Sequence, residues 1–303
     1  MTSEKAAEPD VSAPVPAPAD LAKLRIVPRN NLFRWVPVAI VVFAILALLD
    51  GVAFNPRFEW PTVGHYLFAP VILKGLLVTI WLTALCMALG LILGITIAVM
   101  RMSPSRIVSG FAAIYIWFFR GTPVLVQLIF WYNLAALFPT LSLGIPFGPR
   151  FIGFDTNAVI TPLAAAVLGL ALNEGAYMAE IVRAGIASVD HGQEEAARAL
   201  GMTRFKSLLR IVLPQAMRFI VPPTGNETIG MLKMTSLVSV IALSDLLYSA
   251  QAIYSRTFET IPLLLVCCCW YLLLTSLLGM VQARIEAHYG RGASPAGRRR
   301  GEP

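Results

Sequence analysis

Six apolar stretches, each long enough to cross a bilayer, constrain the fold of this chain more than any other feature. A helix needs about 20 apolar residues to span the roughly 30 Å hydrocarbon core. The stretches occupy about residues 35–54, 71–100, 107–138, 158–189, 226–247 and 261–281. Composition agrees, because 57% of the 303 residues are hydrophobic and only 14% are charged, against roughly 25% charged in a soluble domain. The sequence therefore predicts an all-α polytopic membrane protein with about six transmembrane helices, and it disfavours soluble enzymes and nucleic-acid binders.

The basic residues are distributed unevenly between the loops. Eighteen of the 24 Lys and Arg residues lie in the N-terminal tail 1–34, the loop 101–106, the stretch 183–218 and the C-terminal segment 284–303. Six spans place all four segments on one side of the membrane, and by the positive-inside rule that side is cytoplasmic. We therefore expect a multi-pass membrane protein with both termini in the cytoplasm. The net charge of +7 then reflects topology.

The chain divides into four parts. Residues 1–34 predict a disordered, basic cytoplasmic tail, and 35–70 predict an extra transmembrane helix with an outer loop. The main transmembrane domain is expected over 71–284, followed by a basic cytoplasmic tail over 285–303. Inside the main domain, Gly90 and a second glycine four residues later form a small-xxx-small pair that favours close helix packing.

A polar loop between the fourth and fifth apolar stretches contains two short predicted helices. Asp190, followed three residues later by Gln193, is typical of a capping box at a helix start. Gly201 is placed to end this helix in a left-handed cap. Thr203 is placed to cap a second helix, which we expect Pro214 to stop. The helix chemistry alone leaves two alternatives open, an amphipathic linker on the membrane surface or a docking element for a partner.

The same loop carries a spaced motif. It reads Glu195-Ala196-Ala197, then Gly201, then Ile211, then Leu213-Pro214. At these spacings it resembles the EAA loop of ABC importer permeases. The segments 119–127, 175–186 and 225–233 resemble the polar amino-acid uptake branch of that family, and the resemblance covers about residues 71–284.

The resemblance implies a five-helix type I permease core in a bacterial cytoplasmic (inner) membrane, preceded here by one extra span. Such subunits pair as homodimers or heterodimers, dock a coupling helix on separate ABC ATPases, and receive substrate from an extracytoplasmic solute-binding protein. The substrates implied are polar or charged L-amino acids of the histidine, glutamine, glutamate, arginine or opine type. The resemblance assigns ATPase coupling to Glu195, Ala196, Ala197, Gly201, Ile211, Leu213 and Pro214.

No phosphate-cradling Gly-x-x-x-x-Gly-Lys-Ser/Thr run occurs in this sequence. We therefore expect a transport subunit that is not an enzyme and has no catalytic residue, metal or cofactor of its own. ATP and Mg are expected on the partner ATPase.

Several polar side chains fall at membrane depth, where a charge costs about 3 kcal/mol unless it faces protein or water. Asn173, Tyr177 and Glu180 share one helix face at positions i, i+4 and i+7, and Glu174 borders that face. We expect this face to line the translocation path and to meet the α-ammonium or a polar side chain of the substrate. The alternative for Glu180 is a structural position near the cytoplasmic end of its helix.

The third apolar stretch is interrupted at Arg120-Gly121-Thr122-Pro123, where glycine and proline favour a helix break. The backbone groups freed by a break must find partners in protein or water. Arg120 is suited to bind a carboxylate, either that of the substrate or that of Glu174. The alternative for Arg120 is a brace between helices, and the alternative partner for Glu174 is Lys233. Weaker path candidates, with helix–helix hydrogen bonding as their alternative, are Thr122, Gln127, Asn226, Glu227, Thr235 and Ser236.

Two other functions compete with this interpretation. An ion-coupled secondary amino-acid transporter needs no ATPase, but the loop motif and the lack of a matched second half with a similar broken helix argue against it. A membrane enzyme is disfavoured because His65, His191 and His288 each stand alone.

Met234 stands where many relatives have an acidic residue, so no role of that acid is carried over to this chain.

Overall fold

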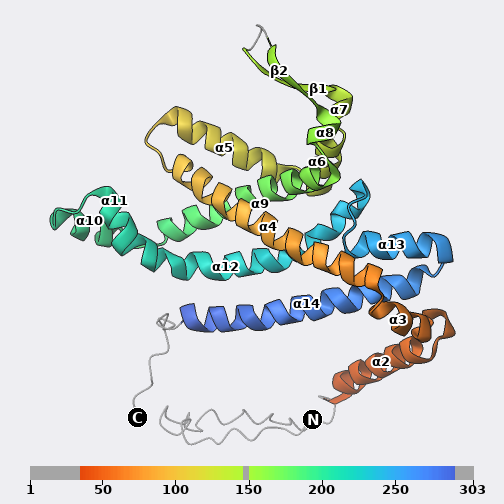
Figure 1. Ribbon diagram of the computed structural model, residues 1–303. Coiled ribbons are helices and arrows are strands. Elements are labelled where there is room, and N and C mark those ends of the chain that lie inside the picture. The colour runs from red at the N-terminus through yellow and green to blue at the C-terminus, as the bar shows by residue number, and fades with distance from the viewer. Residues whose placement is uncertain (1–34, 146–149, 291–303) are drawn as a thin grey trace, which may run out of the picture. The chain divides into compact units, whose positions relative to one another are not determined.

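The computed structural model describes residues 35–145 and 150–290 (Figure 1). The chain divides into two compact units, Met1–Asn55 and Pro56–Pro303, which are described here one at a time. The predicted N-terminal tail and the last part of the predicted C-terminal tail, 291–303, lie outside the described residues.

The first unit contains helix α2, Trp35–Phe54. Its mean hydropathy is 2.5, and none of its residues is buried. A helix that is apolar on every side and buries nothing within its own chain has the character of a lipid-facing span. The extra helix predicted at the start of the chain is therefore present.

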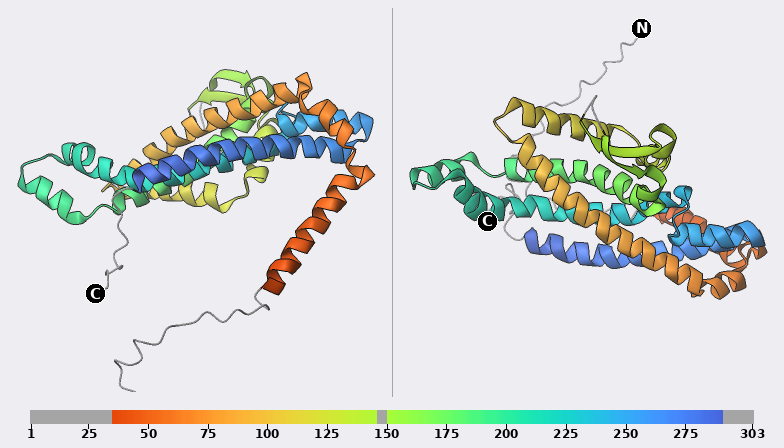
Figure 2. Two further views of the ribbon diagram at one scale, coloured as in Figure 1. Left: turned by 90° about the horizontal axis from the view of Figure 1, so that it is seen from below. Right: turned by 45° about the horizontal axis from the view of Figure 1, so that its top comes forward.

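The second unit is built mainly of helices that pack side by side (Figures 1 and 2). Its long helices are α4 (Pro70–Arg101), α5 (Arg106–Gly121), α9 (Pro162–Ala187), α12 (Leu213–Met234), α13 (Leu246–Thr257) and α14 (Thr260–Tyr289). Its shorter helical elements are η2 (Pro56–Phe58), α3 (Trp60–Leu67), α6 (Val124–Tyr132), α7 (Leu134–Leu137), α8 (Thr156–Val159), α10 (His191–Ala199), α11 (Arg204–Ser207), the π-helical η3 (Leu208–Val212) and the 3-10 helix η4 (Thr235–Ile241).

Four of the described helices, α2, α4, α9 and α14, are long and apolar enough to cross a membrane. Two further candidates are bent: α5 and α6 meet at 100°, and the run Arg204–Ile241 meets α13 at 44°. Counting each bent pair as one span gives up to six spans. The predicted all-α membrane fold is confirmed.

Helices α4 and α9 pack closely at the centre of the second unit. Gly90 of α4 lies against the side chain of Glu174, and Gly94 lies against Met178, both on α9. A Cβ atom at position 94 would stand 2.4 Å from the Cβ of Met178. The predicted role of these two glycines in helix packing is therefore confirmed.

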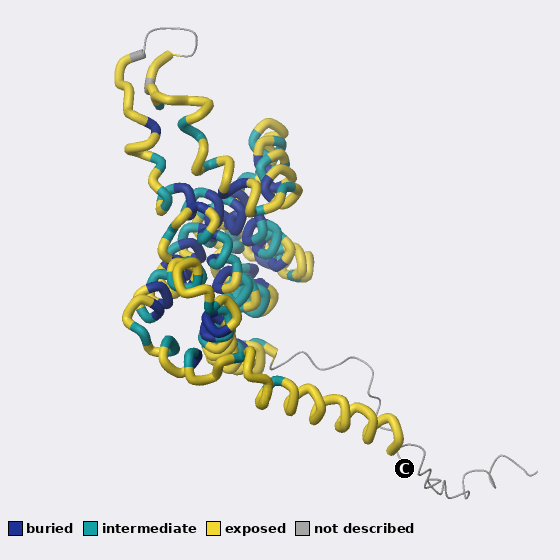
Figure 3. The backbone as a smooth tube through the Cα atoms, turned by 90° about the vertical axis from the view of Figure 1, so that its right-hand side faces the viewer, coloured by how far each residue is buried: buried dark blue, intermediate teal, exposed yellow. Residues whose placement is uncertain are grey.

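The buried apolar side chains gather where helices meet, while outward faces remain exposed (Figure 3). One cluster joins Leu82 of α4, Leu128 of α6, Leu170 of α9 and Met231 of α12. The outward apolar faces fit a protein whose surroundings are hydrocarbon, because lipid removes the need to bury them.

The fifth predicted span starts in the wrong place. We expected it to begin after Pro222-Pro223, but α12 starts at Leu213 and contains both prolines. Each proline removes one backbone N–H donor from the helix, and such gaps are tolerated in membranes where neighbouring groups satisfy the freed backbone. Gln282 of α14 contacts the helix at this point, because its Nε2 donates to the carbonyl oxygen of Pro222 at 2.7 Å.

A hairpin that the sequence analysis did not predict connects α7 to α8. Strands β1 (Thr140–Gly144) and β2 (Arg150–Asp155) pair antiparallel, with Leu141 opposite Phe154. The hairpin projects away from the helices, beyond α7 and α8 (Figure 1). Its short alternating strands were hidden in a region that we assigned only as the connection between two apolar stretches.

The contact between α4 and α9 yields a stability test. The Cβ introduced by Gly94→Ala meets the Cβ of Met178 and the backbone nitrogen of Ala179, and neither can move like the end of a flexible side chain. We expect the free energy of unfolding to fall by about 1–3 kcal/mol. Thermal unfolding of the purified protein in detergent measures it. Gly279→Ala is the matched control, because nothing lies within 4 Å of its added Cβ. Equal melting temperatures for the two variants would contradict the packing argument.

Candidate coupling loop and substrate path

The first helix of the polar loop, α10, has the ends that the sequence predicts. Asp190 is the N-cap, and its Oδ1 accepts from the backbone N–H of Gly192 at 2.7 Å. Gln193 does not complete the predicted capping box. Its Oε1 atom accepts from Nε2 of Gln215 on α12 at 3.3 Å instead. This bond connects the loop to a membrane-spanning helix.

The turn after α10 depends on Gly201. Its φ is +73°, in the left-handed region that favours glycine. The N–H of Gly201 donates to the carbonyl of Arg198, and that of Met202 donates to the carbonyl of Ala197, which together form a Schellman motif. The predicted left-handed cap is confirmed, and it fixes the angle between the two parts of the loop.

The second half of the loop differs from the prediction at its end. Thr203 caps α11 as expected, accepting from the N–H of Lys206. Pro214 does not stop the second helix, because η3 runs directly into α12, whose first turn contains that proline. Proline is tolerated in a first turn, and the widened π-helical turn at Ile211 carries the chain past it. The motif residues 211–214 are therefore part of a continuous helical connection into the membrane.

The exposed face of the loop is only partly the one expected. Ala197 is fully buried, whereas Ala196 and Glu195 are exposed. Leu200 is 81% exposed and Phe205 is 69% exposed, so two large apolar side chains flank the glycine turn. The sequence analysis assigned the coupling role to both alanines and did not single out this apolar pair. The sequence held the signal, since Leu200 directly precedes the predicted glycine cap.

Charged residues on α10 pair with each other. Arg198 forms an ion pair with Glu194 at 2.9 Å, one helical turn away. Because the pair is exposed, it contributes little to stability. Glu195 keeps an exposed carboxylate for a partner.

The helix break between α5 and α6 is held by two amide side chains. The carbonyl oxygen of Phe119 accepts from Nδ2 of Asn173 at 2.6 Å and from Nε2 of Gln127 at 3.2 Å. Gln127 also donates to the hydroxyl of Thr122 at 2.8 Å. The structure thus brings three predicted path residues together at the break, in contacts that satisfy the backbone.

Glu174 lies on α9 beside the break, fully buried, and neither carboxylate oxygen has a hydrogen-bond partner. The carboxylate of Glu227 on α12 is near enough to interact with it electrostatically. Among the described residues, no ion pair joins Glu174 to Arg120 or Lys233, so the structural alternative that we considered is not formed. Two acidic side chains are therefore near enough to interact, and no hydrogen bond to Glu174 offsets this.

Arg120 is the basic residue that interacts with this acidic pair. Its guanidinium carbon is 5.1 Å from the ring centroid of Tyr177, a cation–π distance, and it interacts electrostatically with Glu227. Glu180 is engaged elsewhere, because it forms an ion pair with Arg183 at 2.7 Å. On the predicted face of α9, Tyr177 lies against Arg120. Glu180 is paired with Arg183, about one turn closer to the polar loop.

The hydroxyl groups near the end of α12 bond to their own backbone. Thr235 donates to the carbonyl of Leu232, and Ser236 donates to that of Lys233, both at 2.7 Å. These bonds fit the helix-supporting alternative for both hydroxyls. Their predicted role in the path stays a prediction.

One buried acid was missed by the sequence analysis. Asp245 is fully buried and caps α13, accepting from the N–H groups of Leu247 and Tyr248. The hydroxyl of Tyr271 is buried without a partner. A polar residue directly before an apolar run is an N-cap signal, and this one lay inside a stretch that we assigned as a single span.

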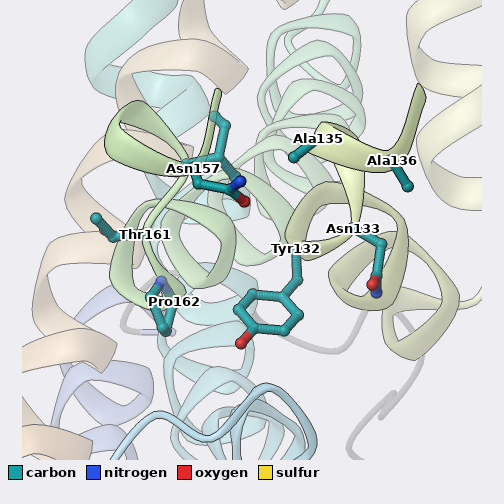
Figure 4. A pocket seen from close by; sticks show the side chains of 8 residues that line it. Tyr132, Asn133, Ala135, Ala136, Asn157, Thr161 and Pro162 are labelled. Atoms are coloured by element: carbon teal, nitrogen blue, oxygen red, sulfur yellow. The ribbon is translucent and has the colours of Figure 1, made fainter. Parts of the chain in front are cut away.

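Two cavities lie outside the predicted path residues. One of about 430 Å³ is lined by the ends of α6, α7 and α8 and the start of α9 (Figure 4), with Tyr132, Asn133, Ala135, Ala136, Asn157, Ile160, Thr161 and Pro162 around it. A groove of about 710 Å³ lies between the loop and the ends of α12 and α14, and its polar lining includes Asp190, Gln193, Gln215, Arg218 and Glu286.

Residues 90–291 match a protein family described as "Binding-protein-dependent transport system inner membrane component". The chain is 44% identical to the arginine transport system permease protein ArgU of Corynebacterium glutamicum, over 94% of this chain and 88% of that protein. It is 38% identical to the L-cystine transport system permease protein TcyB of Bacillus subtilis, over 80% of this chain and 96% of that protein.

Solved structures give the same result. An amino acid ABC transporter crystallised with histidines has a chain 37% identical to this one, with a TM-score of 0.62 over 73% of this chain and 95% of that chain. A chain of an inward-facing methionine ABC transporter has a TM-score of 0.56 at 16% identity and shows the fold alone. The predicted resemblance to amino-acid ABC importer permeases is confirmed, and the ion-coupled alternative gains no support.

The two amides at the helix break can be tested for joint action. In Asn173→Leu or Gln127→Leu alone, the carbonyl of Phe119 keeps one of its two amide donors. The double variant removes both. An unsatisfied buried carbonyl costs about 1–3 kcal/mol, so we expect the double variant to lose more stability than the sum of the single losses. Thermal unfolding of the four proteins gives this coupling energy. Strict additivity would show that the two amides do not share the carbonyl.

Proposed function

The chain belongs to the family of binding-protein-dependent transport system inner membrane components, and we propose that it serves the import of arginine or another basic amino acid. As a permease subunit of an ABC amino-acid importer, it is a transport protein and not itself an enzyme. The observation that carries the choice of substrate is the 44% identity to an arginine transport permease over 94% of this chain. A match of that length takes in α2 as well as the shared core.

The charges near the helix break support a basic substrate. Glu174 and Glu227 place two carboxylates close together, one of them fully buried and without a partner. Buried charges of one sign are stabilised by a bound charge of the other sign. A guanidinium or ammonium group bound between them satisfies both. Arg120, held over Tyr177, is then available to bind the α-carboxylate of the substrate with two parallel hydrogen bonds.

The remaining path residues act in this proposal through the shape of the site. Asn173 and Gln127 hold the carbonyl of Phe119 at the break, and this keeps Arg120 at the end of α5. Thr122 lies on the same break and is tied to Gln127. These groups position the charged side chains and do not themselves select a basic substrate.

The polar loop is proposed to dock on a separate ATPase. Its exposed surface offers Glu195, Ala196, Leu200 and Phe205, a combination of one charge and two large apolar groups around a fixed glycine turn. The motif residues Ile211, Leu213 and Pro214 belong to the helical connection into α12. A displacement of the loop is therefore passed to α12, the helix that carries Glu227. ATP and Mg are bound by the partner, and this chain contributes the mechanical link.

An orientation in the membrane is part of the proposal. In the second unit, α10 and α11 lie at one end of the long helices and α13 lies at the other (Figure 1). From the distribution of basic residues, we propose that the loop end and both chain termini face the cytoplasm and that the opposite end faces a solute-binding protein. A second permease subunit, either another copy of this chain or a relative, completes the path between the two.

Neutralising Glu174 tests the substrate site. Glu174→Gln retains the shape of the side chain but removes its charge, and a hydrogen bond to a charged group is worth about 1.5–3 kcal/mol. We expect the half-saturating arginine concentration for uptake to rise about tenfold or more. Uptake by proteoliposomes that contain the complete importer measures it. Glu180→Gln is the control, since Glu180 is already paired with Arg183. An unchanged affinity and rate in Glu174→Gln would rule out the lining role.

A change at the loop turn tests the coupling role. Gly201→Val places a β-branched residue at φ +73°, a conformation that costs L-residues about 1–2 kcal/mol and β-branched ones more. We expect substrate-stimulated ATP hydrolysis to fall about fivefold or more, because the turn can no longer present the docking surface. Gly201→Asn is the matched control, because asparagine tolerates the left-handed region. Full stimulation in Gly201→Val would contradict the proposed docking.

A further inference from the structure

Gln282 of α14 contacts α12 at the proline pair Pro222-Pro223. Gln282 is 5% exposed, and its Nε2 donates to the carbonyl of Pro222 at 2.7 Å and to Oε1 of Glu286 at 2.8 Å. Pro222 and Pro223 each lack the N–H that would bond to the preceding turn, so α12 has fewer internal bonds here than elsewhere. The amide of Gln282 contacts the backbone at this point.

The approach of the two helices depends on Gly225. A Cβ at position 225 would stand 1.7 Å from Oε1 of Gln282 and 2.6 Å from its Cδ, so any larger residue displaces the amide. The Oε1 atom itself is buried and has no hydrogen-bond partner. A buried amide with an unsatisfied acceptor carries a free-energy penalty that an apolar residue of the same size avoids. Packing alone therefore does not account for a glutamine at this position.

The position of this contact along α12 gives it a mechanical meaning. On the loop side, Gln215 of α12 bonds to Gln193 of α10 and to the carbonyl of Ile211. On the other side of the proline pair, α12 carries Glu227. Along α12, movement of the loop therefore passes through the proline pair before it reaches Glu227.

We propose that Gln282 is a positioning residue that braces the proline hinge of α12, so that movement of the coupling loop is passed to Glu227 and not lost by bending at Pro222-Pro223. The proposal rests on the coupling role given above to the loop. Gln282 touches no substrate. It acts by fixing the backbone of the hinge through the Pro222 carbonyl.

The test uses the complete importer, with ATPase and binding protein, in proteoliposomes. Gln282→Leu removes the amide and retains most of its volume. We expect arginine transported per ATP hydrolysed to fall about fivefold or more, with the arginine concentration for half-maximal uptake unchanged. Gln251→Leu, on an exposed face of α13, is the matched control and is expected to transport as wild type does. A merely structural role would lower uptake and ATP hydrolysis together and leave their ratio unchanged, and that result would overturn the proposal.

A second pair of variants separates the hydrogen bond from packing. Gly225→Ala alone displaces the amide, and we expect it to lower transport per ATP as Gln282→Leu does. Gly225→Ala combined with Gln282→Ala relieves the clash but does not restore the bond, so we expect it to fold and remain uncoupled. Recovery of the wild-type ratio in the double variant would overturn the role of the bond. Failure of the proposed function has a different signature, namely a wild-type chain whose partner ATPase is not stimulated at all.

Discussion

The structure depends on the requirement that backbone groups inside a bilayer find hydrogen-bond partners within the protein. Regular helices meet it by themselves, but this chain breaks the helix between α5 and α6 and removes two N–H donors from α12 at Pro222-Pro223. At both places a buried amide side chain from another helical segment bonds to the backbone. Asn173 and Gln127 bond to the carbonyl of Phe119, and Gln282 bonds to that of Pro222. The irregular backbone is thus confined to places where polar side chains converge.

The same convergence explains where charge is found. Close approach of α4 and α9 at Gly90 leaves Glu174 no access to solvent, and α12 brings Glu227 toward it. Helix breaks supply polar surroundings, glycine contacts remove water, and the acidic pair is left with Arg120 nearby. A transporter for charged molecules needs such a site at membrane depth, because an unpaired charge there is expensive until a ligand arrives.

The sequence predicted most of the fold, since hydropathy reports directly on which segments can lie in lipid. It also predicted the glycine cap at Gly201, because only a local conformation was involved. It was wrong about Pro214 and about Pro222-Pro223, which we took as helix ends. The effect of a proline depends on its place in the helix and on neighbours such as Gln282, and neither is visible in a local pattern. The burial of Ala197 and the partner of Glu180 were also missed or left open, because they depend on three-dimensional packing.

We propose that this chain uses ATP hydrolysis by a partner to move a basic amino acid across the membrane. The test is uptake of labelled arginine into proteoliposomes that contain the chain, its ATPase and its binding protein, with ATP supplied or withheld on the ATPase side. We expect uptake that requires ATP and the binding protein and does not change with an imposed proton or sodium gradient. Arginine uptake driven by such a gradient without ATP would contradict it.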